Sequence, residues 1–241
     1  MRLGHGSTAS DGSSEADLSG TAVVGYSSVV DMAGGHFFYD PAAAALSTTR
    51  VGDVFTNMDG LGRDDRILYE TPGFYGFKAA TSWISGGAAD ISVGYAGEMG
   101  PVSLAAAAAY AGYGTNTANM DNQLNGSASV LHQSGLNFTL AAGKRRFNLA
   151  GRDDATFYYG KLGYRRDFFE FGETAFAADL ARNFDLAANS DEADSFGLVG
   201  VQNFKNWGTE YYLGYRFYKL ERPGTDLDRI DAVMTGVRVK F

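Results

Sequence analysis

Apolar and polar residues alternate with a period of two through the last strand-length segment of the chain. In residues 230–241 the odd positions are mostly apolar, whereas two cations, Arg238 and Lys240, occupy even positions. Side chains point alternately to the two faces of a β-strand, so this stretch predicts a strand with one apolar and one polar face. The apolar face carries Val233, Thr235, Val237, Val239 and Phe241.

The same alternation recurs upstream, where glycine-rich or polar stretches separate the periodic segments. Leu136, Phe138 and Leu140, for example, alternate with Asn137 and Thr139. The pattern predicts about twelve strands in total. They lie near residues 2–7, 64–70, 74–84, 90–99, 101–112, 122–133, 136–147, 154–167, 173–183, 194–204, 207–219 and 229–241.

The connections between these predicted strands alternate in length. Short turns such as Gly100-Pro101 and Phe171-Gly172 alternate with longer polar stretches at 114–121, 148–154 and 187–194. Short turns on one rim and long loops on the other are typical of outer-membrane β-barrels. The sequence therefore predicts an all-β fold, a transmembrane antiparallel β-barrel.

Composition agrees with a barrel and excludes several other classes. The chain has 32 Gly, 17 Phe and 14 Tyr but no Cys, which excludes a disulfide scaffold and a cysteine-based zinc site. Its uncharged apolar runs are far shorter than the roughly 18 residues that a membrane helix needs. A net charge of -8 argues against nucleic acid as a partner. We expect no cofactor and no bound metal.

Residues 8–62 break the period-two pattern. They contain turn-forming pairs such as Asp11-Gly12 and Asp59-Gly60, together with too many apolar residues for simple disorder. We expect this segment to fold against the barrel interior. The predicted organisation is one barrel domain over residues 1–241, with an inserted segment at 8–62 and eleven strands within 63–241.

Five short stretches within and just after the inserted segment are distinctive: residues 8–12 (TASDG), 15–21 (EADLSGT), 51–55 (VGDVF), 59–66 (DGLGRDDR) and 69–77 (YETPGFYGF). The first four resemble the constriction-loop region of proteobacterial general porins. The fifth is similar to the strand and turn that follow that region in the same family.

The resemblance implies a sixteen-stranded, trimeric porin whose third loop folds into the lumen between strands five and six. Residues 2–7 would then be strand five, so this chain would supply about twelve of the sixteen strands. Four N-terminal strands and a signal peptide would precede Met1. The resemblance further implies a protein of the Gram-negative outer membrane that is not an enzyme and that passes small hydrophilic solutes and ions by passive diffusion.

On this interpretation, charges that line the narrowest cross-section set the selectivity of the pore. We expect Arg63 and Arg66 to be the main cations there, facing Asp53 and Asp59 on the inserted segment. Each of these charges has an alternative role as an ion pair that holds the segment to the wall. Further candidates are Asp31, Arg145, Arg165, Arg216 and Arg238.

The C-terminal strand resembles the signal that barrel-assembly machinery reads in this family. Its residues Val237, Val239 and Phe241 are therefore the candidate assembly signal. The expected partners are that machinery, outer-membrane lipid and lipopolysaccharide, and two further copies of the chain in a homotrimer.

Two other functions remain open at the level of sequence. One outer-membrane barrel family is a phospholipase with a His-x-Ser pair, and His132-Gln133-Ser134 has that spacing. Residues two apart on a strand share a face, although Ser134-Gly135 also has the composition of a turn. The other alternative is a non-conducting barrel for anchoring or adhesion.

Overall fold

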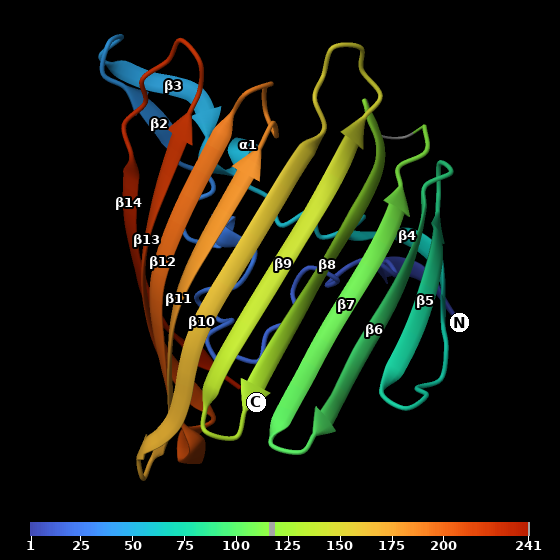
Figure 1. Cartoon of the computed structure of the whole chain (residues 1–241), viewed down its shortest axis with the longest axis vertical. Helices are drawn as coiled ribbons and strands as arrows, with labels where there is room; N and C mark the ends of the chain where they lie inside the picture. The colour runs from blue at the N-terminus through green and yellow to red at the C-terminus, as the bar shows by residue number, and fades with distance from the viewer. Residues whose placement is uncertain (116–118, 241) are drawn as a thin grey trace.

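The computed structural model describes residues 1–115 and 119–240, and these residues form an almost entirely β structure. Twelve strands make one antiparallel sheet in which each strand pairs with the next along the chain, except that β1 pairs with β4. Figure 1 shows these strands side by side in a curved sheet. The strands are β1 (Arg2–Ser7), β4 (Arg63–Glu70), β5 (Phe77–Ile84), β6 (Ala89–Met99), β7 (Val102–Gly112), β8 (Met120–His132), β9 (Leu136–Phe147), β10 (Ala155–Phe169), β11 (Gly172–Phe184), β12 (Glu192–Phe204), β13 (Thr209–Glu221) and β14 (Ile230–Val239).

All twelve predicted strands are present, and most of their boundaries lie close to those expected. The strand predicted at 74–84 begins only at Phe77, because Tyr75 and Gly76 have positive φ angles of 47° and 86° and form a tight turn. Similarly, the strand predicted at 207–219 begins at Thr209. It follows a short 3-10 turn, η2 (Lys205–Trp207), and a left-handed residue, Gly208.

The sheet does not close into a barrel within the described residues. Strands β1 and β14 are the two edges of the sheet, and the described residues contain no pairing between them. Each edge strand therefore leaves one side of its backbone without a neighbouring strand. The barrel wall is present as an open, curved sheet.

The two faces of this sheet are the reverse of those of a water-soluble protein. Large apolar side chains on one face are exposed, as at Leu162, Phe176 and Leu198. On the other face many polar side chains are buried, including Gln123 and Lys161. Water-soluble domains bury their apolar face instead, so this inversion fits a sheet whose outer face meets lipid.

Residues 8–62 leave the sheet after β1 and return to it at β4 (Figure 1). They include elements that the sequence pattern did not predict. These are the 3-10 turn η1 (Val29–Asp31), the hairpin of β2 (Phe37–Asp40) and β3 (Ala45–Arg50), and the one-turn helix α1 (Val51–Val54). No helix among the described residues is long and apolar enough to cross a membrane.

A small apolar core joins the segment to the sheet. Phe38, Val51 and Phe55 of the segment are almost completely buried, and they belong to one cluster with Phe157 and Tyr218 of strands β10 and β13. The rings of Phe55 and Tyr218 meet edge to face, with centroids 5.5 Å apart. The segment thus packs on the polar face of the sheet, away from its exposed apolar face.

Candidate pore-lining segment

The first part of the segment, residues 8–19, is held to the sheet by hydrogen bonds from its backbone. The Ser10 amide donates to the Asp90 carboxylate at 2.8 Å, and the Ala16 and Leu18 amides donate to Ser127 and Ser129 of β8, each at 2.9 Å. Each of these wall residues occupies an inward-facing position in the alternation along its strand. Further bonds join Ser14 to Asn125, Val29 to Tyr218, Thr56 to Asn183 and Met58 to Gln123.

A buried amine also attaches the segment to the wall. Lys161 on β10 forms an ion pair with Asp17, and the two side chains are 0% and 5% exposed. The Lys161 Nζ also donates to Ser19 Oγ at 3.0 Å, to Thr21 Oγ1 at 3.2 Å and to the Gly25 carbonyl at 2.7 Å. A buried ammonium group needs such partners, because an unpaired charge in a protein interior is very costly.

Arg216 lies beside this attachment and is also buried. Its guanidinium donates to both oxygens of Asp179, at 2.7 and 2.8 Å, and to Ser195 at 3.1 Å. Gly25 lies so close above the wall here that a Cβ atom would come within 2.9 Å of Val199. Arg216 therefore lies on the inner face, as predicted, but its charge is paired beneath the segment.

Three other predicted cations lie on the inner face with partners of their own. Arg165 donates to Glu173 at 2.9 Å and to the Leu18 carbonyl at 3.1 Å, so it contributes to the attachment of the segment. Arg145 donates to the neutral side chain of Gln123 at 2.9 Å. Arg238 on β14 donates to Glu210 at 2.6 Å.

The structure does not bring together the four residues that we expected at the constriction. Arg63 is exposed, and its position in the alternation along β4 places it on the outward-facing side of the strand. Arg66 is on the inner side, but it donates to the carbonyls of Ser7 and Gly4 in the edge strand β1, at 2.9 and 2.7 Å. Asp53 pairs locally with Arg50, whose backbone amide is 2.8 Å away and lowers the pKa of Asp53.

Asp59 shapes the segment itself. Its carboxylate accepts hydrogen bonds from the Gly12 amide at 2.7 Å and the Ser14 amide at 3.0 Å, and so joins the two ends of the segment. Burial nevertheless raises the pKa of Asp59, and the negative charge of the nearby Asp11 contributes to this rise. Asp31, at the end of η1, is exposed and accepts a hydrogen bond from Ser28 at 3.3 Å.

Glu15 is the acidic residue that the sequence interpretation missed. It lies between Ser14 and Ala16, both bonded to the wall, and its Oε1 accepts from Asn57 at 2.9 Å. Burial, together with the negative charges of Asp59, Asp11 and Asp31, raises the pKa of Glu15 to about 7. The sequence did contain a signal for Glu15, because this residue lies within the stretch 15–21 on which the resemblance to the porin loop rests.

The candidate assembly residues lie at the edge of the sheet. Val237 and Val239 on β14 are exposed on the outward, apolar face. The third candidate, Phe241, lies outside the described residues. The described residues also contain no group of acidic or histidine side chains arranged to hold a metal ion.

The His-x-Ser pair forms the end of a strand and a turn. His132 Nδ1 lies 2.8 Å from Ser134 Oγ and accepts from the Ser134 backbone amide at 3.2 Å. Both hydrogen bonds involve Nδ1, and among the described residues no side chain forms a hydrogen bond or ion pair with the other ring nitrogen, Nε2. A catalytic pair needs a third group to orient the histidine, so this geometry favours the turn.

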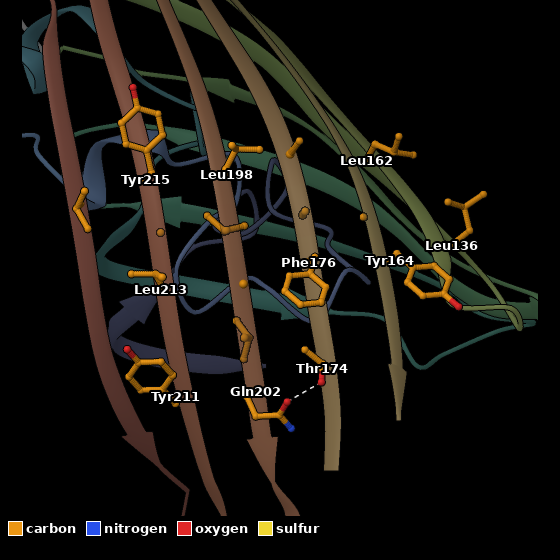
Figure 2. Close-up of a pocket in the computed structure, with 18 residues that line it drawn as sticks. Leu136, Leu162, Tyr164, Thr174, Phe176, Leu198, Gln202, Tyr211, Leu213 and Tyr215 are labelled. Carbon is orange, nitrogen blue, oxygen red and sulfur yellow. Dashed lines mark hydrogen bonds between the residues drawn. The ribbon is translucent and has the colours of Figure 1, made fainter. Parts of the chain in front are cut away.

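The outer face has a broad apolar hollow of about 840 Å³ across strands β9 to β14. Figure 2 shows Leu162, Phe176, Leu198 and Leu213 directed away from the sheet around it. The labelled Gln202 and Thr174 bond to each other at its lower end, at 2.5 Å. A lining of this kind suits hydrocarbon chains rather than polar solutes.

Comparison with solved structures identifies the fold. An anion-selective porin from Comamonas acidovorans matches 98% of this chain and 71% of its own, with a TM-score of 0.55 and 18% identity. Outer-membrane expressed OmpT of Vibrio cholerae matches 98% of this chain and 73% of its own, with a TM-score of 0.51 and 11% identity. The chain has the fold of an outer-membrane β-barrel protein.

A loop-deletion mutant of that Vibrio cholerae outer-membrane protein matches this β-barrel chain as well. It covers 97% of this chain and 74% of its own, with a TM-score of 0.53 and 11% identity. No protein-family model matches the sequence, and no curated protein matches it significantly. The relationship therefore lies in the fold, which agrees with the exposed apolar face and the buried polar face of this sheet.

Proposed function

We propose that this outer-membrane β-barrel protein is a porin, a water-filled channel for passive diffusion of small hydrophilic solutes and ions. The observation that carries the proposal is the position of residues 8–62. They pack on the polar face of a sheet whose other face is apolar and exposed, attached by Lys161, Ser127 and Ser129. A polar segment across the inside of a barrel narrows its lumen and places charge there.

The proposed channel is completed by further strands. Because neighbours in the sheet are antiparallel, the twelfth strand, β14, runs opposite to β1, and an even number of added strands closes the barrel. Closure is needed in lipid, where unpaired backbone groups at an open edge cost several kcal/mol each. Four added strands give the sixteen-stranded porin, with residues 8–62 as its constriction loop, and three such barrels form a trimer.

Charge on the segment supports selective passage of ions. Residues 8–62 carry seven carboxylates and one arginine, so they hold six of the eight net negative charges of the chain. Asp17 is neutralised by Lys161 and Asp53 by Arg50. Of the five other carboxylates, Asp11, Glu15 and Asp59 form a cluster that favours cations near the constriction.

The experiment that tests the porin proposal is ionic current through planar bilayers as a function of pH. The pKa of Glu15 is raised to about 7, so Glu15 is largely neutral at pH 6 and largely ionised at pH 8. The groups facing it are Asp59, Asp11, Asp31 and Tyr26, none of them a cation. We expect the cation/anion permeability ratio to rise about twofold over this range, since one charge is gained near the path.

Two results separate the channel from the role of Glu15. In Glu15→Gln the current should persist and the pH dependence between pH 6 and 8 should disappear. Correctly folded protein that gives no current steps at any pH contradicts the porin proposal. Current steps with the same pH dependence in Glu15→Gln contradict the assignment of Glu15 alone.

The same proposal includes the surroundings of the channel. Outer-membrane lipid and lipopolysaccharide would cover the apolar face, and barrel-assembly machinery would read the C-terminal strand with Val237, Val239 and Phe241. Lipid hydrolysis that is lost in both His132→Ala and Ser134→Ala would favour the enzymatic alternative instead.

A further inference from the structure

A polar hollow of about 310 Å³ lies on the inner face, where the start of the segment meets strands β4 to β7. Asp11, Gly12 and Ser13 of the segment form one side of it. From the wall it is lined by Lys78 of β5 and by Arg2 of β1 and Glu70 of β4, which form an ion pair with each other at 2.8 Å. Unlike the apolar hollow on the outer face, this one is bordered by charges of both signs.

Strand register shows why the hollow stays open. Lys78 pairs with Gly94, Gly94 with Ala107 and Ala107 with Ser127, so these four residues form one row across β5, β6, β7 and β8. Ser127 is where the segment attaches, through the Ala16 amide. Lys78 and Ser127 are three strand spacings apart, or about 14 Å, and only a glycine and an alanine lie between them.

Lys78 differs from the other cations on the inner face. Among the described residues, Lys78 has no hydrogen-bond or ion-pair partner. All the remaining inward-facing lysines and arginines of the strands have one. The Lys78 side chain is exposed and borders the hollow. Its charge is therefore available to a passing ion, whereas those of Lys161 and Arg216 are neutralised.

We propose that Lys78 is the wall cation that sets the ion selectivity of this channel, acting across the polar hollow from Asp11. This inference rests on the proposed porin function. It gives Lys78 the role of constriction cation that the sequence analysis had assigned to Arg63 and Arg66. The path for ions follows the small inward-facing residues Gly94 and Ala107. The opposed charges limit how strongly the acidic segment favours cations, because a positive charge beside the path repels them.

The test uses cysteine chemistry, because the chain contains no cysteine. Lys78→Cys is placed in planar bilayers, and the reversal potential is measured in a salt gradient before and after charged thiosulfonate reagents. Removing the lysine charge should raise the cation/anion permeability ratio about twofold. A positively charged reagent should restore the original ratio, and a negatively charged one should raise it about twofold again.

Arg63→Cys is the matched control, because Arg63 is an exposed cation on the outward side of β4. Its reversal potential should respond to neither the substitution nor the reagents. Asp11→Asn should shift the ratio in the opposite direction to Lys78→Cys. A conducting Lys78→Cys channel whose reversal potential is unchanged by both reagents overturns the inference and leaves the porin proposal standing. Absence of current from the completed barrel without these substitutions contradicts the porin proposal itself.

Discussion

Lys161→Met is expected to detach residues 8–62 from the wall. Lys161 is the fully buried partner of Asp17 and also binds Ser19, Thr21 and the Gly25 carbonyl. Removing one partner of a buried ion pair leaves an uncompensated charge and costs about 3–5 kcal/mol. The measurement is the free energy of unfolding in lipid vesicles, combined with the rate of protease cleavage within residues 8–62.

Two variants make this result specific. Lys161→Met combined with Asp17→Leu removes both charges, and it should recover most of the lost stability because no buried charge is left unpaired. Lys144→Met removes a cation that is 57% exposed on the outward side, next to Asp154, and should change stability by less than about 1 kcal/mol. Equal stability of Lys161→Met and Lys144→Met would mean that the amine does not hold the segment.

Leu198→Arg is expected to impair insertion of the sheet into lipid. Leu198 is exposed at the centre of β12, on the apolar face, and borders the outer hollow (Figure 2). A charged side chain on the lipid face near the bilayer midplane costs about 2–4 kcal/mol. The loss should appear in the free energy of folding into vesicles, measured by urea titration.

The control for this variant lies on the inner face. Ala107→Arg introduces the same charge beside the polar hollow, where the proposed channel supplies water. Its cost should be well below that of Leu198→Arg. If both variants fold into vesicles with the same free energy, the two faces of the sheet do not differ in their contact with lipid.

The strands and their faces could be predicted because they depend on local periodicity. Alternation of Tyr211, Leu213 and Tyr215 with Tyr212 and Arg216 places each residue on one face whatever the neighbouring strands do. The structure confirms that Tyr211, Leu213 and Tyr215 are outward and that Arg216 is buried on the inner face. Boundaries were wrong mainly where positive φ angles delayed a strand, as at Tyr75 and Gly208.

The inserted segment was harder to predict, because its elements are determined by contacts distant in sequence. The short helix at Val51–Val54 and the hairpin before it lie on an apolar core that includes Phe157 and Tyr218. Neither partner lies near the segment in the sequence. Periodicity thus indicated that residues 8–62 fold on the sheet without indicating their shape.

The charges of the candidate site were partly misassigned for the same reason. Charge and sequence position suggested Arg63 and Arg66, but strand parity directs Arg63 outward and edge carbonyls bind Arg66. Which cation stays free depends on partners far along the chain, as Lys161 and Asp17 show. Lys78 lies at an inward position of β5, but only the structure shows that it faces a hollow.

The most direct measurement of the central claim is the accessibility of spin labels in protein reconstituted into vesicles. Single cysteines at Phe176, Leu198 and Leu213 sample the outer face, and cysteines at Ser92 and Ala107 sample the inner face. The outer labels should collide with oxygen dissolved in lipid and be shielded from a water-soluble nickel reagent. The inner labels should collide with the nickel reagent, because a porin lumen contains water. Outer labels open to the nickel reagent would contradict the membrane-spanning sheet, and inner labels shielded from it would contradict the water-filled channel.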